Sequence, residues 1–280
     1  KFDELFYLQL LLAYRKREVK LEQKGVSFNV TSKLARRLVD SLPFELTKAQ
    51  KRVIREIADD MSSDRPMNRL LQGDVGSGKT IVALIAMLIA IENGYQTAFM
   101  APTEILSEQH FRTLRNFLKD IPVNVRLLIG GQRQRLRRDI LEDVRRGSAQ
   151  LVVGTHALIQ QQVTFDQLGF VVIDEQHRFG VLQRSVLREK ALTSSVMPVH
   201  PDLLVMTATP IPRSLAMTVY GDLDVSVIDE MPAHRRPIQT SVRFDSERQR
   251  VYDFVRQEIA KGRQAYIVYP LIEESEKVDL

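Results

Sequence analysis

Residues 73–80 read GDVGSGKT, which matches the phosphate-binding loop pattern G-x-x-x-x-G-K-[ST] in full. Glycines suit such a loop because a β-carbon would keep the backbone N–H groups from wrapping around phosphate oxygens. The lysine meets the charge of the β- and γ-phosphates, and the hydroxyl after it ligates Mg²⁺. The stretch predicts a nucleoside triphosphate site made by Gly73, Asp74, Val75, Gly76, Ser77, Gly78, Lys79 and Thr80.

The segments on either side of this loop support the same interpretation. Residues 69–72 have the apolar character of a short buried strand, and residues 81–86 that of an apolar helix. A strand, a glycine-rich loop and a helix in this order place phosphates at a helix N-terminus, where negative charge is favoured. The plain alternative is a flexible glycine turn.

Further short β-rich runs follow, separated by helical stretches, and they cover residues 97–101, 125–129, 151–154, 170–174 and 203–207. Continuous apolar runs of this length indicate a parallel sheet that is covered on both faces. In such sheets ligands bind at the carboxyl ends of the strands, where the polar turns of this sequence fall. We therefore predict an α/β nucleotide-binding domain.

An acidic cluster follows the run that ends at Asp174. A carboxylate at a strand end can ligate Mg²⁺ from the side opposite to Thr80, so Asp174 is the second candidate metal ligand. Glu175 is the candidate base that orients the attacking water. Two interpretations stand for Gln176 and His177: they sense the γ-phosphate and signal its loss, or they cap the next helix.

Two more motifs fit a nucleotide site. Thr207 and Thr209 place hydroxyl groups on a tight turn after a strand, where they can bond to the acidic cluster and couple phosphate release to movement. Phe44 offers an aromatic face and Gln50 a bidentate amide, a pair suited to stacking on adenine and reading its N6/N7 edge. The plain alternative for the second motif is a helix start capped by Thr47.

Short polar turns after the strands are the candidate nucleic-acid contacts. Their backbone N–H and hydroxyl groups suit phosphates rather than base edges. The candidates are Pro102, Thr103, Gly130, Gly154, Thr155 and His156. Residues 133–147 carry six arginines against three acidic residues, which fits either a binding face or a solvated helix surface.

Composition limits the classes of protein that are possible. A chain of 280 residues with 44% hydrophobic content can bury the core of one large domain or two smaller ones. The absence of Cys excludes disulfides and a thiolate zinc site and fits a reducing compartment, so we expect a cytoplasmic protein. The most apolar window, residues 5–14, is too short to span a bilayer, so no membrane role is expected. The net charge of +5 suits a polyanionic partner without requiring one.

The chain is expected to divide into a helical segment, a nucleotide-binding domain that starts at Pro43, a linker and the beginning of another domain. A helix over about residues 2–22 would be apolar on most of its circumference. The expected parts are residues 1–42, 43–228, 229–237 and 238–280.

The last part has the pattern of a β-α-β unit, with strands over residues 239–244 and 265–269 around a helix over residues 248–261. A unit of roughly forty residues cannot close a core of its own, so we expect this domain to continue beyond residue 280.

Taken in order, the motifs LTKAQ, GDVGSGKT, APTEIL, GTHAL, DEQH and TATPIP resemble those of superfamily 2 helicases and translocases. More narrowly, VIDEQHRFGVLQR and MTATPIPRSLAMTVYGDLD are similar to the RecG family of branch-migration helicases, and KFDELFYLQLLLAYR resembles the helix before their motor. The resemblance covers essentially the whole chain. It implies a RecA-like P-loop NTPase sheet, an N-terminal helical segment and the start of a second RecA-like domain.

The same resemblance implies ATP and Mg²⁺ as cofactors and ATP hydrolysis coupled to the unwinding of DNA. The expected partners are branched or forked DNA, such as stalled forks and Holliday junctions in recombination and repair. The rest of the protein's own chain is a further expected partner: a wedge domain joined to residues 1–42 and a complete second motor domain that supplies an arginine finger. Residues 43–228 would be the first motor domain.

Two alternatives remain open at this point. The transcription-repair coupling factor has a similar motor but usually DEE where this sequence has Asp174, Glu175 and Gln176. The other alternative is a nucleotide-binding switch that touches no nucleic acid. Salt-dependent binding to branched DNA separates such a switch from the two DNA motors.

Overall fold

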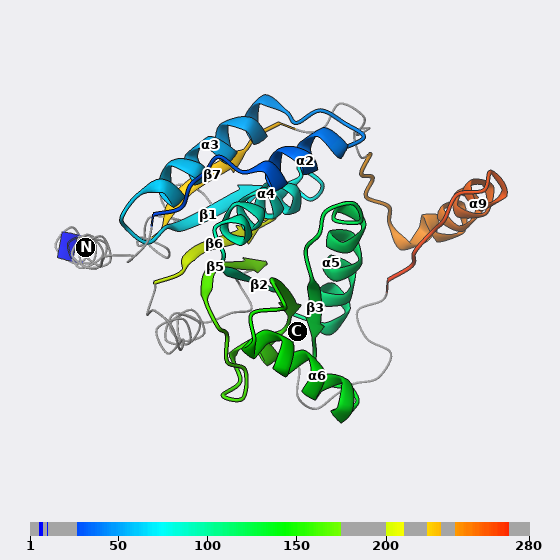
Figure 1. The fold of residues 1–280 in the computed structure, drawn as a ribbon. Helices are drawn as coiled ribbons and strands as arrows, with labels where there is room; N and C mark the ends of the chain where they lie inside the picture. Colours follow the sequence, from blue (N-terminus) through cyan, green and yellow to red (C-terminus); the bar gives the residue numbers. More distant parts are fainter. Residues whose placement is uncertain are drawn as a thin grey trace. The chain divides into compact units, whose positions relative to one another are not determined.

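Parallel strands build the sheet that organises the larger part of the chain (Figure 1). The computed structural model describes residues 6–7, 10, 27–174, 200–209, 223–230 and 239–268. These residues belong to two units, Lys1–His234 and Arg235–Leu280, each of which is described by itself. The boundary between the units falls within the expected linker.

The sheet of the first unit has seven strands, all of them parallel to their neighbours. The strands are β1 (Asn68–Gly73), β2 (Gln96–Met100), β3 (Val125–Leu128), β4 (Leu151–Gly154), β5 (Leu168–Asp174), β6 (Asp202–Thr207) and β7 (Asp224–Ile228). They lie in the order β3-β4-β2-β5-β6-β1-β7. The predicted parallel sheet is confirmed, and every run proposed for it between residues 69 and 207 is a strand. β7 escapes prediction because its segment DVSVI mixes polar and apolar residues, as a half-covered edge strand does.

Helices and one short 3₁₀ segment connect these strands. Those described in the first unit are α2 (Lys33–Ser41), α3 (Lys48–Ser62), α4 (Lys79–Glu92), α5 (Glu104–Phe117), α6 (Gln134–Arg145) and η1 (His156–Ile159). α4 extends the apolar helix expected after the glycine-rich loop to fourteen residues.

Side chains along the strands alternate between two hydrophobic cores, one on each face of the sheet. In β5, Phe170 and Val172 belong to the core that contains α4, whereas Val171 and Ile173 belong to the core on the other face. Because successive side chains of a strand point to opposite faces, a strand buried on both faces must be apolar throughout. This double burial explains why the sequence shows continuous apolar runs rather than alternation.

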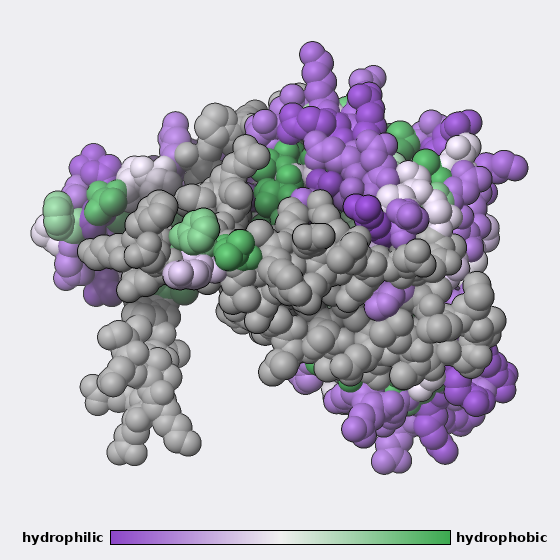
Figure 2. All heavy atoms as spheres, turned by 90° about the vertical axis from the view of Figure 1, so that its left-hand side faces the viewer, coloured by the Kyte–Doolittle hydropathy of each residue, from purple (hydrophilic) through white to green (hydrophobic). Residues whose placement is uncertain are grey.

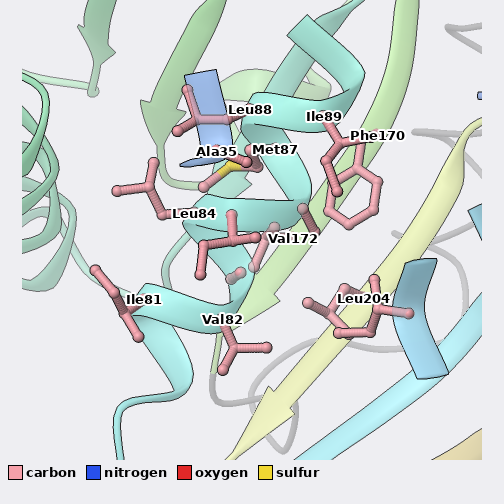
Figure 3. Close-up of a cluster of buried hydrophobic side chains, with 14 of the residues drawn as sticks. Ala35, Ile81, Val82, Leu84, Met87, Leu88, Ile89, Phe170, Val172 and Leu204 are labelled. Carbon is pink, nitrogen blue, oxygen red and sulfur yellow. The ribbon is translucent and has the colours of Figure 1, made fainter. Parts of the chain in front are cut away.

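Helix α4 is apolar around its whole circumference. Every residue from Ile81 to Ile91 is buried. A helix of this kind is stable only when it is covered on all sides. It packs on β1, β2 and β5, and α2 and α3 also contact it. In Figure 3 Phe170, Val172 and Leu204 point from the sheet toward α4.

Gln96 is a buried polar side chain, 3% exposed, at the start of β2. Its Nε2 donates hydrogen bonds to the carbonyl oxygens of Val144 (2.9 Å) and Ala149 (2.8 Å). Its Oε1 accepts from the backbone N–H groups of Asp166 (2.7 Å) and Gln167 (3.2 Å). One side chain therefore satisfies four backbone groups in the segments that lead into β4 and β5.

Most of the expected N-terminal helix lies outside the described residues; Phe6, Tyr7 and Leu10 are helical. Among the helices that the structure describes, none has the length and apolar character needed to cross a membrane. On the face shown in Figure 2 the described surface is largely hydrophilic, with apolar side chains in small groups.

The second unit is described over residues 239–268 and contains η3 (Asp245–Glu247) and α9 (Arg248–Ala260). The helix expected over residues 248–261 is present. The strand predictions for residues 239–244 and 265–269 are wrong for every residue of theirs that the structure describes. A strand exists only when its backbone is bonded to another strand, and no such pairing occurs within residues 239–268. No residue of this stretch is buried.

Replacing Gln96 with Leu should lower the free energy of unfolding by about 3 kcal/mol or more, because each backbone group left unsatisfied in the interior costs about 1–3 kcal/mol. Urea unfolding of the 280-residue chain, followed by circular dichroism, measures this loss. The matched control is Gln162→Leu, an exposed glutamine whose replacement should change stability by less than about 0.5 kcal/mol. Equal stability of the two variants would contradict the role given to Gln96.

Candidate nucleotide-binding site

The glycine-rich loop and the acidic cluster begin at nearby strand ends. β1 ends at Gly73 and β5 at Asp174, and β6, which ends at Thr207, pairs with both strands. In these pairs Gln72 lies opposite Thr207, and Asp174 lies opposite Met206. The structure thus brings the three predicted positions to the carboxyl edge of the sheet, where parallel α/β sheets bind their ligands.

Residues 73–80 form a tight loop that opens into α4. Gly76 and Gly78 have φ angles of 82° and 88°, a region that favours glycine. At Gly73 a β-carbon would lie 2.6 Å from Ser77 Oγ, so this position needs glycine for space. Gly78 is the N-cap of α4, and no side chain caps the helix there. The backbone N–H groups and the dipole at this end of α4 therefore favour an anion.

The polar side chains of the loop fit a phosphate ligand. Ser77 Oγ is buried and has no hydrogen-bond partner among the residues that the structure describes. Lys79 Nζ donates to the carbonyl oxygens of Gly73 (2.6 Å) and Asp74 (3.0 Å), so the ammonium group lies over the loop. Val75 is 68% exposed at the open side. A buried hydroxyl, an ammonium and an uncapped helix start are the donor set that a triphosphate requires.

Gln50 is 1% exposed, and both ends of its amide are engaged. Oε1 accepts from the backbone N–H of Thr47 at 2.8 Å, while Thr47 Oγ1 accepts from the N–H of Gln50 at 3.1 Å, which makes a capping box at the start of α3. Nε2 donates to the carbonyl oxygen of Ser77 at 2.8 Å. The helix cap considered as the plain alternative is therefore present. For Gln50 to bond to adenine, its amide must give up one of these hydrogen bonds or share it with the base.

Glycine at position 78 also makes room for this contact, since a β-carbon there would lie 2.3 Å from Gln50 Nε2. Phe44 lies nearby in sequence and is 41% exposed. It borders a hollow of about 410 Å³ together with Pro43, Leu46 and Lys51. The aromatic face expected for base stacking is thus partly accessible.

The chain that leaves β7 is fastened to α3. Glu230 Oε2 accepts from the backbone N–H of Ala49 at 3.0 Å. Arg52 Nη2 donates to the carbonyl oxygen of Val227 (2.8 Å) and to Asp229 Oδ1 (3.0 Å). The backbone N–H of Asp229 and the Arg52 guanidinium hold the pKa of the Asp229 carboxyl below its usual value. The start of the expected linker therefore contacts the helix that carries Gln50.

Asp174 is buried at the end of β5, and its Oδ2 accepts a hydrogen bond from His110 Nε2 at 2.8 Å. Thr80, the other candidate metal ligand, is half-buried in the first turn of α4. A carboxylate and a hydroxyl are oxygen ligands of the kind that Mg²⁺ prefers. Both residues stand at the carboxyl edge of the sheet, so the chain offers a donor set suited to Mg²⁺ with a triphosphate.

Glu175, Gln176 and His177 lie outside the described residues. Thr207 is buried, Thr209 is exposed, and their hydroxyl oxygens are 2.9 Å apart. The backbone N–H of Thr209 also donates to Thr207 Oγ1 at 3.2 Å. The tight hydroxyl turn expected after β6 is therefore present, and it is closed by its own hydrogen bonds.

The first two turns proposed to contact nucleic acid are joined to each other. Pro102 and Thr103 are half-buried, and Thr103 Oγ1 caps α5 by accepting from the N–H of Leu106 at 3.2 Å. Gly130 is exposed, and its N–H donates to Glu104 Oε1 at 2.9 Å. Glu104 thus holds the loop after β3 against the start of α5.

The third turn is largely buried. Gly154 is buried, and a β-carbon there would lie 2.3 Å from the carbonyl oxygen of Leu128. Thr155 is also buried, and its hydroxyl accepts from the N–H of Ala157 to cap η1. His156 is exposed. Of these three candidates only His156 presents its side chain to solvent.

The arginine-rich stretch forms α6 and pairs with its own acidic residues. Glu142 contacts Arg145 at 3.1 Å and also Arg146. These two arginines, Arg145 first, hold the pKa of the Glu142 carboxyl below its usual range. Arg126 of β3 contacts Asp143 at 2.6 Å. This pairing favours the interpretation of a solvated helix surface.

Two residues at the site were not predicted, although the sequence carries a signal for each. His110 lies three positions after Ser107 and four before Leu114, both fully buried, so helical spacing places it on the covered face of α5. Glu104 occupies the first turn of α5, where an acidic residue is favoured, but its contact with Gly130 depends on tertiary structure.

Comparisons with known proteins agree with this geometry. The model of the DEAD/DEAH box helicase family matches residues 47–218. The ATP-dependent DNA helicase RecG of Aquifex aeolicus is 51% identical over 279 residues, which cover 100% of this chain and 34% of that protein. RecG of Thermotoga maritima is 52% identical over 281 residues, which cover 100% of this chain and 35% of that protein.

Solved structures show the same relation. A structure of RecG bound to a three-way DNA junction matches 97% of this chain and 35% of that one, with 47% identity and a TM-score of 0.82. The DEAD-box helicase Mss116 bound to single-stranded RNA and UDP-BeF matches with 17% identity and a TM-score of 0.62, over 84% of this chain and 52% of that one. The second likeness concerns the fold alone.

The parallel sheet, the glycine-rich loop and the carboxylate at the end of β5 define a P-loop domain with the RecA-like fold. The chain belongs to the DEAD/DEAH box helicase family. Within that family it is homologous to the RecG helicases over its whole length, which confirms the resemblance seen in the motifs. The chain spans about a third of the length of the curated relatives it matches.

Replacing Gln50 with Glu tests the bond between α3 and the phosphate loop. Glutamate keeps the acceptor of the capping box but has no N–H for the carbonyl of Ser77, so the affinity for ATP should fall by about 10-fold, consistent with about 1–3 kcal/mol for an unsatisfied buried group. Titration with a fluorescent ATP analogue measures the affinity. The melting temperature should fall as well, because the Ser77 carbonyl loses its donor and a carboxylate is buried in its place. Unchanged ATP affinity in the folded variant would show that the bond does not shape the site.

Proposed function

We propose that this chain is the first motor domain, with the beginning of the second, of an ATP-dependent DNA helicase that remodels branched DNA in recombination and repair. The observation that carries the proposal is the likeness to RecG bound to a three-way DNA junction, at 47% identity over 97% of this chain. In this assignment residues 43–228 form the first motor domain, residues 229–237 the linker and residues 238–280 the start of the second. Residues 1–42 lead to a wedge domain.

The proposed catalytic groups act on the triphosphate from two strand ends. The loop after β1 would wrap the phosphates, Lys79 would exchange the carbonyls of the loop for phosphate oxygens, and Thr80 and Asp174 would hold the metal. Bound Mg²⁺ supplies charge neutralisation at the β- and γ-phosphates. Glu175 orients the attacking water, and Gln176 and His177 report the loss of the γ-phosphate.

Phe44 and Gln50 are proposed to hold the adenine base. A half-exposed aromatic ring supports stacking, and an amide already bonded to the phosphate loop supports a direct link between base and phosphates. Thr207 and Thr209 are proposed to couple phosphate release to movement of the sheet edge. The turn that these residues form lies at the end of the strand between β1 and β5.

Pro102, Thr103, Gly130 and His156 are proposed to track a DNA backbone. Gly154 and Thr155 are proposed to take part through the backbone of the same turn as His156, since both residues are buried. The supporting observation is their common place at the carboxyl edge of β2, β3 and β4, next to one another in the sheet. Contacts of this kind bind phosphates without reading sequence. A DNA partner and a sequence without cysteine also support a cytoplasmic location.

Lys79 and Glu175 should separate binding from hydrolysis. Lys79→Ala should lose nucleotide affinity, because the charge that meets the phosphates is removed, whereas Glu175→Gln should bind ATP and fail to split it. Nucleotide titration and steady-state phosphate release by the full-length protein measure the two effects. Normal turnover by Glu175→Gln would overturn its assignment as the base.

Forked DNA should stimulate the full-length protein far more than the 280-residue chain alone. An arginine finger from a complete second motor domain would contribute on the order of 10³ to 10⁵ in rate. Phosphate release is measured with a three-way junction, with linear duplex as the control, at low and high salt. Stimulation by neither DNA, with ATP still bound, would favour a nucleotide switch over a DNA motor.

A further inference from the structure

We propose that His110 is the positioning residue that fixes the Asp174 carboxylate for the metal of the nucleotide site. His110 Nε2 and Asp174 Oδ2 are 2.8 Å apart. The side chains are 15% and 12% exposed, so the hydrogen bond is largely shielded from water. This inference rests on the proposed ATP site and assigns the residue that holds one of its ligands in place.

The hydrogen bond leaves one carboxylate oxygen for a cation. Among the described residues, the side chain of Asp174 bonds to His110, and the bond uses the Oδ2 oxygen of Asp174. A carboxylate can only accept a hydrogen bond, so Nε2 of the imidazole ring carries a hydrogen and donates the hydrogen bond. The other oxygen, Oδ1, is then directed by the rotation that this bond imposes. A hydrogen bond from a second residue commonly orients a metal-binding group in this way.

The imidazole ring is itself held in place. Its centroid lies 4.6 Å from that of Phe99, a fully buried residue of β2, at an angle of 45° between the rings. Ser107 and Leu114, on the same face of α5, are fully buried as well. The ring thus has little freedom, and its position follows that of α5 against the sheet. A group that moves little can position its partner well.

The helix that carries His110 begins at a proposed DNA contact. Thr103 caps α5, and Glu104 in its first turn accepts a hydrogen bond from the N–H of Gly130. Two turns further along the helix His110 reaches Asp174. α5 therefore joins the loops proposed to track DNA to the carboxylate proposed to hold the metal, and His110 is the contact between them.

If this hydrogen bond served stability alone, variants of His110 would bind nucleotide with a different dependence on Mg²⁺ from the one proposed. If His110 only filled space, its replacement by an aromatic residue of similar size would leave the metal dependence of nucleotide binding unchanged. If His110 positions Asp174, loss of the N–H should weaken nucleotide binding in the presence of Mg²⁺. Nucleotide binding in the absence of Mg²⁺ should stay unchanged. Loss of such an orienting partner commonly costs about 10–100-fold in metal affinity.

The test uses the full-length protein and a fluorescent, non-hydrolysable ATP analogue, titrated with Mg²⁺ and, separately, with a chelator present. His110→Phe keeps a ring against Phe99 and removes the donor; where it does not fold, His110→Leu replaces it. His110→Gln keeps an N–H at a similar reach. Gln109→Leu, an exposed neighbour on α5, is the matched control.

We expect His110→Phe to raise the Mg²⁺ concentration for half-maximal binding by about 10–100-fold, with unchanged affinity in chelator. His110→Gln should stay within a few-fold of the parent, and Gln109→Leu should match it. Parental Mg²⁺ dependence in His110→Phe, or an equal loss with and without Mg²⁺, overturns the inference. If the parent itself binds the analogue without any dependence on Mg²⁺, the proposed metal site fails first.

Discussion

Burial of α4 on all sides is the constraint on which the rest of the structure depends. The apolar residues from Ile81 to Ile91 are shielded from water only when the sheet, α2 and α3 all pack against α4. Because the helix is held so firmly, the loop that leads into it has a fixed end. The two positive φ angles of that loop, at Gly76 and Gly78, then determine where its N–H groups point. A rigid core thus creates a rigid anion site.

The elements that the sequence predicts best are those buried in the hydrophobic core. Continuous apolar runs predict buried parallel strands because both faces of each strand are covered, and those predictions are confirmed from β1 to β6. β7 is less visible because an edge strand tolerates polar residues. The strands expected near residues 239–244 fail for another reason: local preference cannot supply the partner strand that pairing needs, and the described second unit contains none.

Within the site, motifs predict which residues take part better than they predict the contacts between those residues. The glycine positions of the loop follow from chemistry that any phosphate imposes, so they were visible in the sequence. Gln50 was visible too, but its bond to the carbonyl of Ser77 joins segments that only the fold brings together. His110 and Gln96 show the same limit. Gln96 is buried and the His110 side chain is largely shielded from water, and the groups that each satisfies lie far away along the chain. Hydrogen bonds of this kind leave no periodic pattern in the sequence.

The clasp between α3 and the chain that leaves β7 has a mechanical consequence. Tension on the backbone beyond Glu230 acts on α3 as well as on the sheet, because Ala49 and Arg52 hold Glu230 and Asp229. Ala49 adjoins Gln50, and a single hydrogen bond separates Gln50 from the phosphate loop. A shift of the segment after β7 would therefore be transmitted to the phosphate loop through the first turn of α3.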